Sequence, residues 1–341
     1  MHSNRLLYID GLKGISAIIV VLHHLLLFYR YEYPYLDNLN DIPFINLLVN
    51  GNYAVFIFVT ISSLILGNKT NYDLCIENIQ ITILKRYFRL MFPICIILIC
   101  MAMMKMLGLF YCYEYSELFN ISNIPTFNYS DLLKAIVMSP LGRSYHWLEV
   151  TWMLNYILFG TFICIILAIS LYNINFKKKC IILLATTFIL YIYDTLYASI
   201  IAGYFIVIIN NQIKSRHAKN IIALASLTAI ILIEIINIDI NLNFFLAIFT
   251  ITLCYTSYLH KILSSQFLQI LGKMSLYIYL THVPIIYSFS SYLSLNTDMS
   301  LIAIVFSSII FIMITSFIFY YFVDSHINSS TNKVVKAILN H

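Results

Sequence analysis

Long apolar stretches follow one another along this chain, and each is about as long as a helix that crosses a lipid bilayer. Such a helix needs roughly 20 mostly apolar residues. The sequence offers ten candidate spans, at 12–31, 43–66, 90–110, 150–171, 179–194, 196–212, 220–237, 243–260, 274–294 and 299–322. Only 10% of the residues are charged, whereas a soluble domain carries about 25%. We therefore expect an all-α, polytopic transmembrane helical bundle.

The fifth and sixth spans are separated only by Tyr193-Asp194-Thr195. A single element over 179–212 would be about 34 residues long, which is too long for one ordinary span, so two helices joined by a tight turn are expected. The spans and their short connections use almost the whole chain. We therefore predict one integral-membrane domain over residues 1–341, with no appended soluble domain.

The charges of the connecting segments predict the orientation. Basic residues collect on the cytoplasmic side of membrane proteins, and with the N-terminus placed inside, 16 of the 20 Lys and Arg residues fall on that side. The four outer ones are Arg30, Lys105, Lys134 and Arg143. This bias predicts ten helices with both termini in the cytoplasm, and it explains the net charge of +5 without a nucleic-acid partner. The seven cysteines form no C-x-x-C pair, so we expect no metal ion.

The first expected helix carries ionisable residues that an apolar span normally excludes. Lys13 and His24 are eleven residues apart, which leaves them only about 20° apart around a helix, and Asp10 lies on nearly the same stripe. Ionisable groups at that depth usually face a cavity or a partner. The pattern favours a functional His24, the alternative being a neutral histidine hydrogen-bonded between helices. His23 points roughly 100° away and is the weaker candidate.

Three further segments carry candidate site residues. Arg86 and Arg89 share a helix face at i, i+3 and could hold phosphates, or could simply form a basic cluster that fixes topology. Glu149 follows His146 at the same spacing and could form an acid–base or binding pair with it, although the neighbouring tryptophan is typical of an interfacial anchor. His282 enters the ninth span about two turns from its start, and is either functional or merely hydrogen-bonded.

These segments, in this order, resemble the acyltransferase family 3 membrane proteins, which include bacterial surface-polysaccharide O-acetyltransferases. Residues 10–14 (DGLKG) with His24 are similar to the family's opening motif, and residues 55–66 (VFIFVTISSLIL) to its second-helix segment. Arg86-x-x-Arg89 resembles the paired arginines that enter its third helix. Residues 271–284 (LGKMSLYIYLTHVP) resemble the late motif that ends in His-x-Pro. The resemblance covers most of the chain.

Three positions depart from the family pattern. Ser63 stands where the family usually has glycine, and Lys13 replaces the commoner arginine. When the tryptophan before the fourth span is aligned with the family, Trp152 stands where many members carry glutamate. Either Glu149 substitutes for that glutamate or its role is absent from this chain.

The resemblance implies transfer of an acyl group, most often acetyl, from acyl-CoA to a hydroxyl of a cell-surface glycan or glycolipid. It implies catalytic roles for His24, Asp10 and His282, donor or substrate binding by Lys13, Arg86, Arg89 and Glu149, and no metal or permanently bound cofactor. Acetyl-CoA or another acyl-CoA is the donor, the acceptor is a glycan or lipid-linked sugar, and the expected location is a bacterial inner (plasma) membrane. The alternatives are a transporter or lipid-linked glycan flippase, for which ten helices would serve equally well, and a membrane sensor or structural protein.

Overall fold

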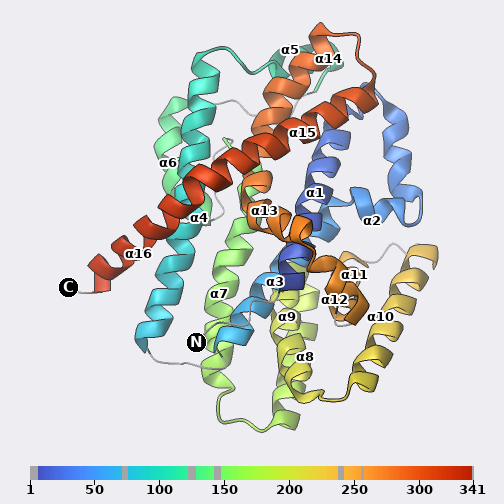
Figure 1. Ribbon diagram of the computed structural model, residues 1–341, viewed down its shortest axis with the longest axis vertical. Helices are drawn as coiled ribbons and strands as arrows, with labels where there is room; N and C mark the ends of the chain where they lie inside the picture. Colours follow the sequence, from blue (N-terminus) through green and yellow to red (C-terminus); the bar gives the residue numbers. More distant parts are fainter. Residues whose placement is uncertain are drawn as a thin grey trace. The chain divides into compact units, whose positions relative to one another are not determined.

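The computed structural model describes residues 7–70, 76–121, 128–141, 147–236, 242–254 and 257–339, and every regular element among them is helical (Figure 1). The predicted all-α class is confirmed. The chain divides into two compact units. Unit 1 comprises residues 1–16, 43–83 and 156–273, and unit 2 comprises residues 17–42, 84–155 and 274–341. Four helices contribute residues to both units, and the prediction of a single domain remains a prediction.

Unit 1 is built around α9. The helices with residues in this unit are α1 (Leu7–Tyr29), α2 (Ile45–Val49), α3 (Gly51–Thr70), α4 (Ile76–Met106), α7 (Trp152–Ser170), α8 (Phe176–Tyr193), α9 (Thr195–Gln212), α10 (Arg216–Ile236), α11 (Leu242–Leu253), α12 (Ser257–Leu263) and α13 (Gln266–Ile285). Helices α3, α8 and α11 all pack on α9, and α10 packs on α11. Pairs of hydroxyl groups join neighbouring helices, as between Tyr53 and Thr250 (2.7 Å) and between Ser226 and Thr252 (2.6 Å). Such bonds satisfy polar groups where water is scarce.

The tight turn expected between the fifth and sixth spans is present. Helix α8 ends at Tyr193 and α9 begins at Thr195. Between them, the Asp194 carboxylate accepts hydrogen bonds from the backbone N–H groups of Leu196 (2.8 Å) and Tyr197 (3.3 Å). An aspartate at this position satisfies N–H groups that a helix start would otherwise leave unpaired. The prediction of two helices here is confirmed.

Unit 2 contains the remaining parts of α1, α4, α7 and α13 and the C-terminal helices. Its further elements are η1 (Pro34–Asp41), α5 (Cys112–Phe119), η2 (Tyr129–Asp131), α6 (Leu132–Met138), η3 (Ser139–Leu141), η4 (Glu149–Thr151), η5 (Ile286–Ser290), α14 (Ser291–Asn296), α15 (Leu301–Phe319), η6 (Tyr320–Asp324) and α16 (Ser325–Leu339). Helix α5 packs on α14 and η5, and α15 packs on η5 and α14. The elements η5 and η6 are π-helical turns, a rare form that often occurs at functional sites. Because η6 joins α15 to α16 without a break, these helices appear as one long red run in Figure 1.

Helix α13 with its continuation through η5 pairs with α15 and its continuation η6 through polar contacts at three levels. The level nearest the cytoplasm, in the predicted orientation, joins the Tyr277 hydroxyl to the Asp324 carboxylate (3.3 Å). The next joins Thr281 to Ser316 (2.9 Å), and the third joins the Ser290 and Ser308 hydroxyls (2.6 Å). These three contacts fix the register of α13 against α15, and therefore the position of His282 along the α15 axis.

Seven helices are long and apolar enough to cross a membrane within the part of the chain that the structure describes. They cover Leu7–Tyr29, Gly51–Asn68, Asn78–Met106, Glu149–Ser170, Thr195–Gln212, Arg216–Ile235 and Leu301–Leu339. The other three expected spans also contain helices. However, α8 begins with three lysines, α11 has only 12 residues, and α13 is rich in polar side chains. The membrane class is therefore supported, while the count of ten and the orientation remain predictions.

Candidate active site

The structure brings together two histidines that are 258 residues apart in the sequence. His24, in the last quarter of α1, and His282, near the end of α13, both belong to unit 2. Their ring centroids lie 4.8 Å apart with the ring planes inclined by 60°. The His282 side chain is fully buried and that of His24 is partly buried. These two expected catalytic residues therefore form a pair.

Hydrogen bonds to the backbone define which nitrogen of each ring carries the proton. His24 Nδ1 lies 2.9 Å from the carbonyl oxygen of Val20, and His282 Nδ1 lies 3.3 Å from that of Ile278. A carbonyl oxygen only accepts, so each Nδ1 must donate an N–H. In the neutral rings, each Nε2 then holds an unshared electron pair.

The Nε2 atom of His282 is buried and has no hydrogen-bond partner in the described part of the chain. Buried polar atoms are nearly always paired, and an exception calls for an explanation such as a catalytic role. A basic nitrogen beside a second imidazole can accept a proton from a hydroxyl group. The pair is thus equipped for general-base chemistry.

His23, the weaker candidate, lies beside the pair without joining it in the same way. Its ring meets that of His24 edge-on, with centroids 5.3 Å apart. The contact is between neighbouring residues of one helix, and His23 acts electrostatically on His282 less strongly than His24 does. His24 therefore remains the better candidate of the two.

Glu149 lies within electrostatic reach of the same region. It is the exposed first residue of η4, and its charge acts on the hydroxyl of Tyr287, five residues beyond His282. A bond from the Tyr279 hydroxyl to the Val150 carbonyl ties η4 to α13. Glu149 therefore lies near the histidine pair without a direct contact to it, and Tyr287 is a neighbour that the sequence patterns did not single out.

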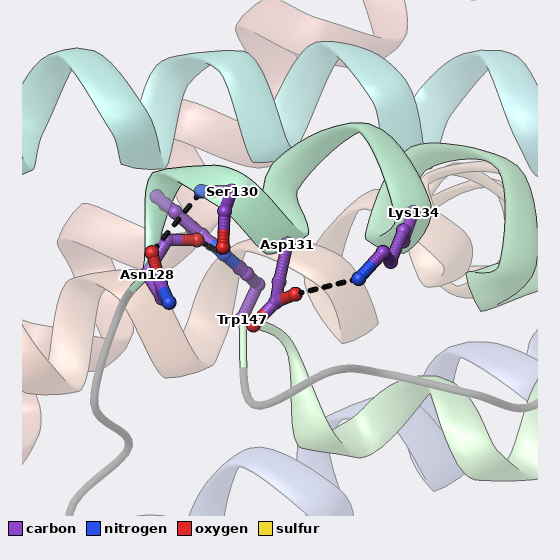
Figure 2. Close-up of polar contacts among 5 residues, drawn as sticks. All are labelled: Asn128, Ser130, Asp131, Lys134 and Trp147. Atoms are coloured by element: carbon purple, nitrogen blue, oxygen red, sulfur yellow. Dashed lines mark hydrogen bonds and ion pairs between the residues drawn. The ribbon is translucent and has the colours of Figure 1, made fainter.

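The segment before Glu149 is held by a buried tryptophan (Figure 2). Trp147 is only 1% exposed, and its indole N–H donates to the backbone oxygen of Asn128 (2.9 Å). The Asn128 side chain in turn accepts from the N–H of Ser130 (3.1 Å). Trp147 is therefore an internal packing residue and not a lipid-facing anchor. His146, the expected partner of Glu149, lies outside the described residues.

Asp10 and Lys13 form an ion pair in unit 1, with Lys13 Nζ 2.8 Å from Asp10 Oδ1. The helix around them packs very closely on its neighbours. A Cβ atom on Gly11 would collide with the backbone oxygen of Leu263, and one on Gly272 would collide with the backbone oxygen of Asp10. Only glycine permits this approach of α1 to the end of α12 and the first part of α13. Helix α1 is continuous from Leu7 to Tyr29. This continuity is required if Asp10 and Lys13 are to share a helix face with His24, as the sequence predicts.

The paired arginines lie on α4 in unit 2, where Arg86 is partly buried and Arg89 is exposed. Arg89 interacts electrostatically with the hydroxyl of Tyr277, five residues before His282 on α13. That hydroxyl donates to Asp324, which also accepts from the Asn328 amide (2.8 Å). Asp324 was missed by the sequence patterns, although an acidic residue directly after the last apolar run was the available signal. A cationic residue and a polar cluster therefore lie along α13 on the N-terminal side of His282.

Helices of membrane-spanning length, and adjacent imidazoles of which one has a nitrogen without a partner in the described part of the chain, define a membrane protein with a candidate catalytic site among its helices. The sequence model described as "Acyltransferase domain" (Acyl_transf_3) matches residues 6–321, nearly the whole chain. The chain therefore belongs to acyltransferase family 3, and it is a membrane acyltransferase. No curated protein and no solved structure gives a match.

Proposed function

We propose that this protein moves an acyl group, most readily acetyl, from acyl-CoA to a hydroxyl of a cell-surface glycan or glycolipid. The observation that carries the proposal is the His24–His282 pair, with an unpartnered Nε2 on His282, in a chain of the acyltransferase family. The protein would act as a multi-pass enzyme of a bacterial plasma membrane. No metal ion or resident cofactor is needed for this chemistry.

In the proposed reaction, His24 Nε2 removes the proton from the acceptor hydroxyl as its oxygen attacks the thioester carbonyl. A C–O bond forms, the C–S bond breaks, and the resulting imidazolium returns its proton to the departing CoA sulfur. The hydrogen bond from His24 Nδ1 to Val20 keeps Nε2 basic at the start of the cycle. His282 borders the reacting atoms, and its free Nε2 stabilises the proton that His24 takes up.

The donor would bind from the cytoplasmic side, where the loop charges place the N-terminus. Arg86 and Arg89, one helical turn apart, are suited to the phosphates of CoA because guanidinium groups form paired hydrogen bonds with phosphate. Asp10 and Lys13 would hold the inner part of α1 in position. Glu149 would act near the acceptor through Tyr287.

The test uses membranes from cells that express the protein, so that the natural acceptor is present. Radiolabelled acetyl-CoA is added, and label in the glycan fraction is measured together with CoA release. We expect His24→Gln to reduce transfer by about 10³-fold, within the range for removal of a general base. His326→Gln is the matched control, because the exposed His326 makes the same kind of Nδ1 bond, to the Phe322 carbonyl at 2.7 Å. Full transfer by His24→Gln would contradict the proposed role.

A second arm addresses the donor. Arg86→Gln with Arg89→Gln should raise the KM for acetyl-CoA about tenfold or more, whereas Lys333→Gln with Lys336→Gln, two exposed cations of α16, should leave it unchanged. An unaltered KM for acetyl-CoA in the arginine double variant would show that these residues fix the membrane topology and do not bind the donor. Movement of a lipid-linked glycan without any CoA release would overturn the enzyme and favour a transporter or flippase.

A further inference from the structure

The two helices that carry the histidine pair carry a second contact one turn further toward their outer ends. Phe28 follows His24 by four residues, and Tyr287 follows His282 by five, across Pro284 and into the π-helical turn η5. The rings of Phe28 and Tyr287 lie 6.1 Å apart. A bond from the Tyr29 hydroxyl to the backbone oxygen of Ser290 (2.9 Å) fixes the two helices at this level. An aromatic level thus lies directly beyond the histidine level.

A third level contains a carboxylate. Glu32 lies in the turn that follows α1, and its Oε2 accepts from the hydroxyls of Tyr115 (3.1 Å) and Ser294 (3.3 Å). Tyr115, from α5, also stacks on Phe28, with ring centroids 4.5 Å apart and planes inclined by 24°. Tyr115 therefore connects the aromatic level to the carboxylate. The sequence patterns did not single out any of these residues.

Glu32 is partly buried, and the described residues give it hydroxyl partners but no cation. Its bond with Tyr33 raises the pKa of that tyrosine, and burial together with the Glu32 charge raises the pKa of Tyr115. Both phenols therefore stay protonated near neutral pH and act as donors to the carboxylate. A half-buried charge that is held by neutral donors remains available to attract a positive group or to repel a negative one.

The charges around Glu32 do not cancel it. The Arg30 guanidinium donates to the Tyr31 hydroxyl (3.2 Å) and lies 5.0 Å above the Tyr31 ring, and no ion pair joins it to Glu32 in the described structure. Glu149, which acts on Tyr287, adds a second negative charge near the aromatic level. Beyond the histidine pair, α1 and α13 therefore carry aromatic rings with two carboxylates near them.

We propose that Phe28, Tyr115, Tyr287 and Glu32 form an acceptor subsite that accepts neutral or amino-bearing sugars and rejects anionic ones. This inference rests on the proposed function and specifies its acceptor. The partly buried rings of Phe28 and Tyr287 pack against the apolar C–H face of a sugar ring, and Glu32 accepts hydrogen bonds from its hydroxyl or ammonium groups. Tyr115 is fully buried and holds the Glu32 carboxylate in place through its hydroxyl. Because Glu32 lies two levels beyond His24, it contacts the sugar unit next to the one that reacts. Specificity then comes from repulsion of carboxylate or phosphate substituents at that unit.

The test measures direct binding of three disaccharides to the purified protein in lipid nanodiscs, without donor. The probes are a disaccharide of glucosamine (cationic), cellobiose (neutral) and the corresponding uronic-acid disaccharide (anionic). The wild type should bind the uronic-acid probe at least about tenfold more weakly than cellobiose. Glu32→Gln, which keeps an oxygen for the Tyr115 hydroxyl, should reduce that difference to about threefold or less. Glu117→Gln removes an exposed carboxylate of α5 and should leave the ranking unchanged.

An identical charge ranking in the wild type and in Glu32→Gln would overturn the subsite, as would no binding of any probe. Thermal unfolding of both variants shows whether a change in binding is a change in folding. Transfer assays with the same probes keep the two proposals separate. Charge-dependent binding through Glu32 without any acetyl transfer would contradict the proposed enzyme activity but support the subsite. Acetyl transfer with the same order of probe affinities in the wild type and in Glu32→Gln would support the enzyme activity but contradict the subsite.

Discussion

Helix α1 contributes to two pairs of polar residues, one within the helix and one with α13, and the pairs differ in how completely their groups are satisfied. In unit 1, Asp10 and Lys13 form an ion pair at 2.8 Å. Gly11 and Gly272 let this part of α1 pack closely against the backbone of the neighbouring helices. In unit 2, His24 and His282 lie side by side with one Nε2 that has no partner in the described structure. The first pair belongs to closely packed structure, and the second keeps a reactive group available.

This difference separates two reasons for polar residues in apolar helices. An ion pair between neighbouring turns lowers the cost of both charges and leaves nothing for a ligand. A buried imidazole without a partner reduces stability, and a fold retains such a group where it acts on a substrate. Substitutions in unit 1 should therefore change the free energy of unfolding, and substitutions at the histidine pair should change the rate of transfer.

The largest effect on stability is expected for Gly272→Ala. The added Cβ would meet the backbone of Asp10, which cannot rotate away as a side chain can. We expect a loss of about 3 kcal/mol, at the upper end for overpacked sites, measured by thermal or detergent-induced unfolding. Gly160→Ala is the control, because its Cβ would meet only the flexible side chain of Ile200, at 3.1 Å. Equal stability of the two variants would show that the α1 crossing is looser than the structure indicates.

The class of fold followed from the sequence because long apolar runs and few charges admit little else. Boundaries were less predictable: the span expected at 243–260 contains a helix that ends at Leu253. An apolar run does not show where along its length a helix ends. The π-helical turns η5 and η6 left no visible pattern either, because they depend on packing between α13 and α15.

The sequence suggested candidate members of the site but not their arrangement. The spacing of Asp10, Lys13 and His24 identified one helix face, and motif resemblance added His282. Helical periodicity shows which residues share a face but not which other helix that face meets, so the 4.8 Å contact could not be derived. The sequence does not single out Glu32 and Asp324, because an acidic residue at the end of an apolar run usually faces water. Their partners Tyr115 and Tyr277 come from distant segments.

His282→Leu should separate activity from stability. Leucine has a similar size and no polar atom, so the unpartnered Nε2 disappears and the free energy of unfolding should stay the same or rise by about 1 kcal/mol. Transfer should fall about 100-fold, because the neighbouring base is lost. His282→Gln, which restores a polar group, should be no more stable than the wild type. A large loss of stability in His282→Leu, with activity lost in proportion, would assign His282 to structure.

The smallest effect is expected for Asp10→Asn, which breaks the ion pair with Lys13. The Asp10 side chain is 8% exposed and that of Lys13 is 25% exposed, so the pair is only partly screened by solvent. We expect a loss of about 1 kcal/mol in unfolding free energy and a change in transfer of about threefold or less. The chain supplies a matched control in Asp131→Asn, whose partner Lys134 has the same i, i+3 spacing at 3.3 Å but is 62% exposed (Figure 2). That variant should change stability by about 0.3 kcal/mol or less. Equal effects at the two sites would mean that burial adds nothing to the inner pair. If Asp10→Asn reduced transfer as much as His24→Gln does, Asp10 would have a catalytic role and not a structural one.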